Sequence, residues 1–348
     1  MSNVSAYAAQ SNDGKMQPFS IERRDVQAND VQMEILFCGV CHSDLHAVKN
    51  DWGNSTYPLV PGHEIIGKVT KVGSDVTKFK EGDTVGVGCL VDSCLSCEAC
   101  NDNLEQHCFE QATMTYNSKS DDPGGVTYGG YSKNIVVREE FVLKVPESID
   151  KAGAAPLLCA GITTYSPLHQ YGVTEGMTVG IIGLGGLGHM GIKFASAMGA
   201  HTVMITTSEK KAKDAKELGA DDVLISSDKD NMKQWAGKFD FLLNTIPVGH
   251  DINPYIKLLK HNSTMCLVGA IEPLDKVNGA LLISGRKAVA GSLIGGLKET
   301  QEMLDFCGEH NVVSTIEKIK IDEINEAFDR MQDNDVRYRF VIDMASLD

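Results

Sequence analysis

The chain has 348 residues, of which 42% are hydrophobic and 23% charged, and a formal net charge of −15 at pH 7. This length predicts two domains, because one hydrophobic core rarely serves so many residues. The acidic charge argues against nucleic acid or an anionic membrane as a partner, since both require clustered Lys and Arg. The sequence contains neither an apolar run of about twenty residues nor a secretory signal. We therefore expect a cytoplasmic protein whose ten cysteines stay reduced.

The first third of the chain has the pattern of a β-rich domain. Strand-like stretches alternate with Gly and Pro turns, and the polar, Gly-rich stretch 117–130 is expected to be a loop. The predicted strands cover residues 31–41, 65–73, 84–91 and 132–137.

Three separate segments carry residues that bind metals in other proteins. CGVCHSDLH contains Cys41, PLVPGHEIIG contains His63, and APLLCAGIT contains Cys159 at the start of a predicted helix. Each residue alone has a structural explanation, because a buried thiol or a turn histidine is common. Together they form the Cys₂His ligand set of a catalytic zinc site, which leaves one coordination position open.

Four further cysteines lie close together in SCLSCEACNDNLEQHC, at positions 94, 97, 100 and 108. The spacing C-x₂-C-x₂-C-x₇-C lets Cys94, Cys97, Cys100 and Cys108 converge on one ion, and four soft sulfurs suit tetrahedral zinc. An iron–sulfur cluster is the first alternative, although its fourth cysteine usually follows after three residues and precedes proline. A redox switch and unused thiols are the others. A zinc ion bound by four sulfurs has no open position, so we expect a structural site.

From about residue 156 the pattern changes to short apolar strands alternating with amphipathic helices. This alternation predicts a parallel sheet covered by helices on both faces. A helix from residue 299 and a strand over 337–344 are expected to close the chain. The strands of the parallel sheet are expected at 178–183, 202–207, 222–225, 239–244 and 264–269.

A glycine loop follows the first of these strands and opens a helix. Gly183, Gly185 and Gly188 have the G-x-G-x-x-G spacing, which permits a tight turn, close approach of a pyrophosphate and close helix–strand packing. A glycine-rich turn that only packs two elements is the alternative. We expect dinucleotide binding by the loop residues Gly183, Leu184, Gly185, Gly186, Leu187 and Gly188.

The end of the second strand indicates which dinucleotide binds. An NAD site usually has an acidic residue there, whereas this chain has Thr206, Thr207 and Ser208, followed by Lys211. Hydroxyl groups and a cation suit the 2′-phosphate of NADP. Glu209 could replace the missing NAD acid, and the lysines could form a solvated helix face, so NAD remains the alternative.

These stretches in this order resemble the zinc-dependent medium-chain alcohol dehydrogenases. The similarity extends to VAGSLIGGLKETQEMLDFC and NDVRYRFVID, and is greatest to cinnamyl alcohol dehydrogenases and bacterial broad-range aldehyde reductases. It implies an α/β protein with a GroES-like, β-rich catalytic domain and a doubly wound Rossmann domain that binds NADP(H). The catalytic domain would comprise residues 1–155 and 295–348, and the Rossmann domain 156–294. The resemblance also implies a homodimer with active sites in the clefts between domains.

The same resemblance implies roles for individual residues. Cys41, His63 and Cys159 match the ligands of the catalytic zinc, and Glu64 matches an acid beside it that sometimes coordinates it. Asp44 matches the carboxylate that orients the ligand histidine, and Ser43 and His46 match a relay that carries the proton between substrate and solvent. Ser292 and Ile294 are further cofactor-binding candidates.

Some positions depart from the plant cinnamyl enzymes and affect the expected substrate. Met114 stands where those enzymes have tryptophan, Leu293 where they have phenylalanine, and Trp52 where they have an aliphatic side chain. We expect these three residues to line the substrate pocket and to allow both aromatic and medium aliphatic aldehydes. A zinc-dependent polyol or sugar dehydrogenase is the nearest alternative, and a non-catalytic zinc-binding redox or interaction module is a second one.

Overall fold

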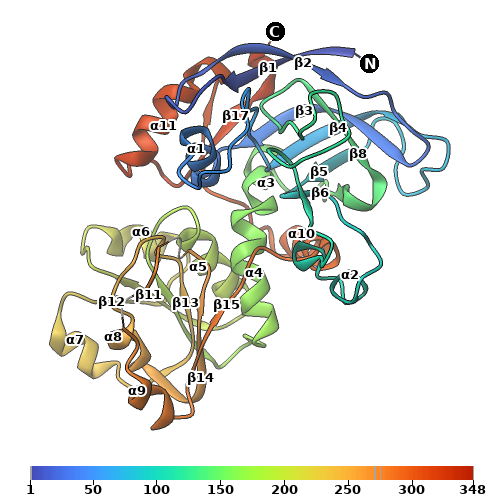
Figure 1. Cartoon of the computed structure of the whole chain (residues 1–348). Helices are drawn as coiled ribbons and strands as arrows, with labels where there is room; N and C mark the ends of the chain where they lie inside the picture. Colours follow the sequence, from blue (N-terminus) through green and yellow to red (C-terminus); the bar gives the residue numbers. More distant parts are fainter. Residues whose placement is uncertain (1, 270–271, 275, 348) are drawn as a thin grey trace. The chain divides into compact units, whose positions relative to one another are not determined.

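The computed structural model describes residues 2–269, 272–274 and 276–347, and its chain divides into two compact units (Figure 1). One unit combines residues 1–159 and 295–348, and the other contains residues 160–294. The sequence-based boundaries lie after residues 155 and 294.

The first unit is built around a seven-stranded sheet with the order β16-β17-β3-β4-β5-β9, in which β8 also pairs with β3. All neighbours are antiparallel except β16 and β17. Strand β4 (IIGKVTKV) is buried at Ile65, Ile66, Gly67 and Val69 and exposed at Lys68, Thr70 and Lys71, so its first half lies in the core and its second half reaches solvent. The strands are β3 (Asp30–Gly39), β4 (Ile65–Val72), β5 (Thr84–Val87), β8 (Asn134–Arg138), β9 (Leu143–Lys144), β16 (Ile316–Ile319) and β17 (Arg339–Asp343).

Smaller elements surround this sheet. Two two-stranded antiparallel sheets accompany it: the hairpin of β1 (Ser2–Ala9) and β2 (Met16–Arg23), and the pair of β6 (Leu90–Asp92) and β7 (Thr113–Met114). The α-helices of this unit are α1 (His42–Lys49), α2 (Glu98–Asn101), α3 (Lys151–Ala154), α10 (Leu297–His310) and α11 (Ile324–Gln332). Its 3₁₀-helices are η1 (Glu105–His107), η2 (Glu139–Phe141), η3 (Ala155–Leu158), η4 (Ile321–Glu323) and η5 (Met344–Ser346).

The second unit contains a six-stranded sheet with the order β12-β11-β10-β13-β14-β15, and every neighbouring pair is parallel. The order reverses between β10 and β13, so the glycine loop after β10 lies at the switch point where open α/β sheets bind ligands. The strands are β10 (Thr178–Ile182), β11 (His201–Thr206), β12 (Asp222–Ile225), β13 (Phe239–Asn244), β14 (Leu259–Leu267) and β15 (Ala288–Gly291).

Helices cover both faces of this parallel sheet. On one face, buried side chains of the strands pack with Ile252 and Ile256, and with Leu281 and Leu282. On the other face, Gly191 lets a helix approach Ile181 and Leu243 closely. The helices of this unit are α4 (Ala160–Gln170), α5 (Gly188–Ala197), α6 (Lys211–Glu217), α7 (Lys229–Gln234), α8 (Asn253–Ile256) and α9 (Gly279–Ile283).

The predicted parallel sheet and the closing strand are confirmed, but several elements differ from the expectation. The stretch 84–91 forms part of two strands, β5 and β6, separated at Gly88 and Cys89. The hairpin β1–β2 and strand β15 were not predicted from the sequence, and the helical end of the chain is divided into α10 and α11 with β16 between them. Among the helices of the described residues, none has both the length and the apolar character needed to cross a bilayer.

Candidate active site

The register of the central sheet brings two of the candidate zinc ligands together. Cys38 at the end of β3 pairs with Ile65 at the start of β4. Cys41 follows this pair by three residues and His63 precedes it by two, so both lie at the same edge of the sheet.

A helix start then fixes Cys41. Cys41 has an extended backbone (φ −114°, ψ 153°) and forms the N-cap of α1, while Asp44 occupies the third helical position. The Asp44 side chain accepts a hydrogen bond from the Cys41 amide at 2.9 Å, which is one half of a capping box. The sequence CHSD therefore places the thiol of Cys41 at the N-terminus of the helix.

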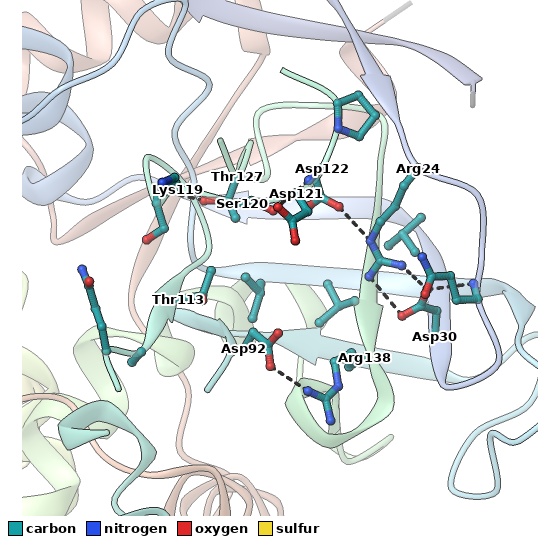
Figure 2. A pocket seen from close by; sticks show the side chains of 18 of the residues that line it. Arg24, Asp30, Asp92, Thr113, Lys119, Ser120, Asp121, Asp122, Thr127 and Arg138 are labelled. Atoms are coloured by element: carbon teal, nitrogen blue, oxygen red, sulfur yellow. Dashed lines mark hydrogen bonds and ion pairs between the residues drawn. The ribbon is translucent and has the colours of Figure 1, made fainter. Parts of the chain in front are cut away.

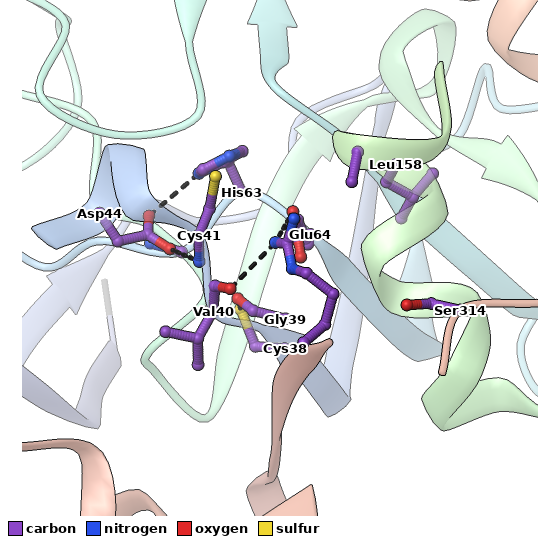
Figure 3. A network of polar contacts seen from close by, with 12 residues as sticks. Cys38, Gly39, Val40, Cys41, Asp44, His63, Glu64, Leu158 and Ser314 are labelled. Atoms are coloured by element: carbon purple, nitrogen blue, oxygen red, sulfur yellow. Dashed lines mark hydrogen bonds and ion pairs between the residues drawn. The ribbon is translucent and has the colours of Figure 1, made fainter. Parts of the chain in front are cut away.

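Asp44 also connects Cys41 to His63 (Figure 3). The Asp44 carboxylate is fully buried and lies 3.0 Å from Nδ1 of His63. It further accepts from the Gly62 amide at 3.1 Å and from the Tyr131 hydroxyl at 3.3 Å. A carboxylate on Nδ1 places the imidazole proton there and leaves Nε2 for a metal.

The ligand atoms of Cys41, His63, Glu64 and Cys159 all lie within 4.8 Å of one another. Cys159 stands directly between η3 and α4, at the end of the first unit. Two thiols and one imidazole are the donors that a catalytic zinc prefers, and a carboxylate is a further possible ligand. The donor set therefore fits zinc.

The two thiols differ in acidity. The pKa of Cys41 is well below its usual value, because it accepts a hydrogen bond from Cys159 and lies near the charges of Arg339 and His63. The pKa of Cys159 is raised, because its thiol hydrogen bonds with Cys41 and with Cys89. Cys41 is thus prepared as a thiolate, which is the form that binds metals.

Glu64 is fully buried, and an arginine holds it. Arg339 on β17 forms an ion pair with Oε1 of Glu64 and donates to the Val40 carbonyl at 2.9 Å, while Oε2 of Glu64 has no hydrogen-bond partner. Burial raises the pKa of Glu64 to about 7, and the charge of Arg339 opposes this shift. Gly39 leaves the space for this carboxylate, because a Cβ there would lie 1.9 Å from Oε2.

Sequence reasoning missed several residues of this network. Arg339 had no local signal beyond its place in the RYRFVID strand, and it reaches Glu64 only because β17 pairs with β3. The ring of Tyr116 lies 5.6 Å from that of His63. Cys89, whose role the sequence left open, has its sulfur 3.8 Å from the Leu158 carbonyl oxygen and interacts with Cys159.

The two candidate relay residues lie on α1. His46 is three residues after Ser43, so both share one side of the helix. Nδ1 of His46 lies 2.7 Å from the Asp51 carboxylate, and its ring is 5.6 Å from that of Trp52. Asp51 therefore orients this histidine, a contact that the sequence did not reveal.

The four-cysteine lobe has the dimensions of a tetrahedral metal site. The sulfurs of Cys94 and Cys100 are 3.8 Å apart, and those of Cys97 and Cys108 are 4.0 Å apart. A tetrahedron with zinc–sulfur bonds of about 2.3 Å has sulfur–sulfur edges of roughly 3.8 Å. All four sulfurs lie within 4.8 Å of one another, so this donor set also fits zinc.

Backbone amides prepare this lobe for a cation. The Cys97 amide donates to the sulfur of Cys94 at 3.3 Å, and the Phe109 amide donates to that of Cys97 at 3.4 Å. Hydrogen bonds from the Ser96 and Cys97 amides lower the pKa of Cys94 to about 6, and the bond from the Phe109 amide lowers the pKa of Cys97. Burial instead raises the pKa of Cys100 to about 12.

The glycine loop of the second unit has the geometry that its spacing predicts. Gly183 has a φ of +94°, which favours glycine. A Cβ at Gly188 would lie 1.9 Å from the carbonyl oxygen of Gly183, whereas the space at Gly185 is open. The loop connects β10 to α5, whose N-terminal amides can bind a phosphate.

Thr206 is the last residue of β11, and Thr207 and Ser208 follow it, so all three lie at the end of the second strand as expected. Thr206 is buried and its hydroxyl accepts from the Ser208 amide at 3.2 Å, whereas Thr207 is exposed. The ammonium group of Lys211 donates to the Leu184 carbonyl at 2.9 Å, so a cation lies beside the glycine loop.

Comparisons with known proteins decide the family. Residues 27–147 match the alcohol dehydrogenase GroES-like domain, and residues 186–309 match the zinc-binding dehydrogenase family. Aldehyde reductase YahK of Escherichia coli is 53% identical over 346 residues, covering 99% of this chain and 98% of the relative. The chain belongs to the zinc-dependent alcohol dehydrogenases. A probable mannitol dehydrogenase of Fragaria ananassa is 52% identical, covering 99% and 96% of the two chains.

Solved structures of this alcohol dehydrogenase family have the same fold. The cinnamyl alcohol dehydrogenase SbCAD4 of Sorghum bicolor has a TM-score of 0.95 and 46% identity, covering 100% of this chain and 99% of its own. CAD of Helicobacter pylori complexed with NADP(H) has a TM-score of 0.91 and 40% identity, covering 99% and 98%. The predicted family, fold class and alcohol dehydrogenase type of enzyme are thus confirmed.

The predicted substrate-pocket residues of this dehydrogenase are large and exposed. Trp52, Met114 and Leu293 have exposed fractions of 45%, 44% and 57%. Ser292 follows β15 and is partly buried, and Ile294 has a φ of +40°. Their contacts with substrate or cofactor stay a prediction.

A separate polar cavity of about 940 Å³ lies in the first unit (Figure 2). Arg24 in its wall pairs with Asp30 and with Asp122, and Arg138 pairs with Asp92 at 2.8 Å. None of the predicted metal ligands or relay residues lines this cavity, and its lining contains more carboxylates than cations. It is therefore no part of the candidate active site.

Proposed function

We propose that this alcohol dehydrogenase is an NADP(H)-dependent enzyme that interconverts primary alcohols and aldehydes, both aromatic and medium aliphatic. The observation that carries the proposal is the convergence of Cys41, His63, Glu64 and Cys159 within 4.8 Å. A metal bound by two thiolates and one imidazole keeps a position for the substrate oxygen, which the four-sulfur lobe cannot offer.

In this proposal the chain binds two zinc ions. Cys41, His63 and Cys159 hold the catalytic ion, with Glu64 beside it, and the four cysteines of the lobe hold a structural ion. When bound, the catalytic zinc polarises the carbonyl as a Lewis acid, and the nicotinamide supplies the hydride to the carbonyl carbon. Asp44 keeps the proton of His63 on Nδ1, so that its Nε2 remains a ligand.

The proton of the reaction moves along α1. In the reducing direction, Ser43 donates its hydroxyl proton to the substrate oxygen and recovers one by way of His46. Asp51, at 2.7 Å from Nδ1 of His46, keeps that ring oriented for the transfer.

NADP(H) is the cofactor that the loop after β11 favours. The hydroxyl groups of Thr206, Thr207 and Ser208 and the ammonium group of Lys211 suit a 2′-phosphate, and the Helicobacter pylori relative was solved with NADP(H). We include the backbone of residues 183–188, together with Ser292 and Ile294, in the cofactor site.

The proposal assigns catalysis and both metals to the unit of residues 1–159 and 295–348, and the cofactor to residues 160–294. We also propose a homodimer in the cytoplasm that acts on small molecules.

Two substrate classes compete, because the relatives include both an aldehyde reductase and a probable mannitol dehydrogenase. We favour aldehydes, since the exposed side chains of Trp52, Met114 and Leu293 are apolar. They would leave most hydroxyl groups of a bound polyol without hydrogen-bond partners, which is unfavourable.

The test follows NADPH oxidation with benzaldehyde, cinnamaldehyde and hexanal, and NADP⁺ reduction with mannitol. We expect turnover of all three aldehydes. The kcat/KM for mannitol should be at least about a hundredfold lower than that for each aldehyde, which is the scale expected when hydroxyl groups lose their hydrogen-bond partners. A preference for mannitol would contradict the aldehyde assignment.

A further inference from the structure

The chain passes between the two units twice, and both passages adjoin a candidate metal site. The first passage follows Cys159, a predicted ligand of the catalytic zinc. The second passage follows Ile294, and helix α10 starts at Leu297. The residues before this helix include Ser292 and Ile294, which our proposed function assigns to the cofactor.

Helix α10 lacks a cap of its own. Its N-cap residue is Gly296, which has no side chain to accept a bond from the first amides. The cap comes from elsewhere in the sequence: Oε2 of Glu105 accepts a hydrogen bond from the Leu297 amide at 2.9 Å. A carboxylate is favoured there, because the N-terminus of a 14-residue helix carries partial positive charge.

Glu105 belongs to the four-cysteine lobe. It lies in η1, between the third and fourth cysteines of the cluster, and is only 6% exposed. The lobe and the start of α10 also touch through their backbones, since a Cβ at Gly296 would lie 1.8 Å from the Asn103 carbonyl oxygen. Within α10, the Thr300 hydroxyl donates to the Gly296 carbonyl at 2.7 Å.

Residues 292–297 form a short segment that is hydrogen-bonded at both ends, at Leu297 and at Ser292. The Ser292 amide donates to the Leu267 carbonyl of β14 at 3.1 Å. Between these two bonds lie only residues 293–296, and Ile294 among them has a left-handed backbone with a φ of +40°. Such a conformation costs free energy in a β-branched residue and persists only when its surroundings impose it.

We propose that Glu105 is a positioning residue for cofactor binding: it fixes the passage at residues 292–297 from the four-cysteine lobe. The lobe then has a second role besides local stability, because its folded state determines where Glu105 lies. This inference rests on the proposed function only in taking Ser292 and Ile294 as residues that contact NADP(H).

The test compares Glu105→Ala, Glu105→Gln and the wild type, all with measured zinc content. We expect Glu105→Ala to raise the Kd of NADPH about threefold to tenfold, the scale of one ordinary hydrogen bond, because the lost bond acts on the cofactor only through the passage. Glu105→Gln retains an oxygen acceptor and should stay within about twofold of the wild type. Hydrogen exchange of a peptide covering residues 292–299 should accelerate in Glu105→Ala without any cofactor present.

Two further variants separate positioning from stability. Glu98→Ala removes an exposed acid of the same lobe and should leave both the Kd and the exchange unchanged. Thr300→Val removes one of the two hydrogen bonds that the Gly296 carbonyl accepts, keeps the Thr300 amide as the other donor and does not touch the lobe. It should raise the Kd of NADPH by less than Glu105→Ala does, with full zinc content. If Glu105→Ala loses the zinc of the lobe, the Kd of Thr300→Val decides between a positioning role and a loss of stability.

The outcomes distinguish the two proposals. Wild-type Kd and exchange in both Glu105→Ala and Thr300→Val would overturn the positioning role and leave the proposed function intact. Absence of NADPH binding by the wild-type protein would instead contradict the proposed function.

Discussion

At the scale of single residues, the candidate active site depends on side chains that never touch the substrate. The buried carboxylate of Asp44 receives bonds from the Cys41 and Gly62 amides, from Tyr131 and from His63. It thereby sets the positions of Cys41 and His63, two proposed zinc ligands that are 22 residues apart in sequence. Arg339 does the same for Glu64.

Asp44→Asn should deplete the catalytic zinc. The amide group presents N–H donors where the structure needs an acceptor, so His63 loses its orientation. Replacement of such outer partners typically weakens metal affinity by about 10–100-fold. Metal analysis should show zinc falling from two towards one ion per chain, with the lobe still loaded. Two tightly bound ions in Asp44→Asn would refute this role.

Ser43→Ala should slow turnover without loss of zinc. Removal of the hydroxyl interrupts proton transfer, and general acid–base catalysis contributes about 10²–10⁴-fold to rates. Steady-state kinetics of aldehyde reduction, combined with metal analysis, measures both quantities. An unchanged kcat would exclude Ser43 from the relay.

At the scale of elements, the two cysteine sets differ in donor type, since one offers four sulfurs and the other two sulfurs, an imidazole and a carboxylate. The tasks that we propose for them follow from this difference: the lobe of residues 94–108 would close a tetrahedron with four sulfurs, and its few buried side chains give it little core of its own. The cofactor candidates lie elsewhere and offer other groups. The loop after β10 presents backbone amides, and the end of β11 and the turn after it present hydroxyl groups and the ammonium group of Lys211.

Cys100→Ser should remove one zinc ion and destabilise the protein. Structural zinc contributes folding free energy, so we expect the thermal midpoint to fall by at least about 5 °C. Cys266→Ser is the matched control, since Cys266 is fully buried on β14 and belongs to neither cluster. The control should keep both ions. Full zinc content in Cys100→Ser would argue against a four-sulfur site.

Lys211→Glu should reverse the cofactor preference. The introduced carboxylate repels a 2′-phosphate, and loss of one charged contact costs about 1.5–3 kcal/mol, or roughly tenfold or more in kcat/KM. We expect this loss with NADPH and little change with NADH. Equal losses with both cofactors would show that Lys211 acts on the loop and not on the 2′-phosphate.

At the scale of the whole molecule, local patterns predicted most of the architecture. Apolar strands alternating with helices indicated the parallel sheet, and the G-x-G-x-x-G spacing indicated the turn at Gly183 and the close contact at Gly188. The spacing of Cys94, Cys97, Cys100 and Cys108 indicated a four-sulfur cluster.

Contacts between residues far apart in the sequence could not be predicted. Arg339 reaches Glu64 from 275 residues away, and Glu105 caps a helix 192 residues later. Neither residue has a local pattern that distinguishes it from an ordinary surface charge. Strand β15 was missed because AVAG is short and partly exposed, so it lacks the apolar run typical of a parallel strand.

The central claim is that the cluster at Cys41, His63 and Cys159 performs the chemistry, and one variant tests it most directly. The measurement is NADPH-dependent aldehyde reduction by Cys159→Ala, together with its zinc content and circular dichroism. The account predicts a folded protein with one zinc per chain and a rate below about 1% of the wild type, since loss of a ligand removes the metal's Lewis-acid contribution. A rate near that of the wild type would contradict it.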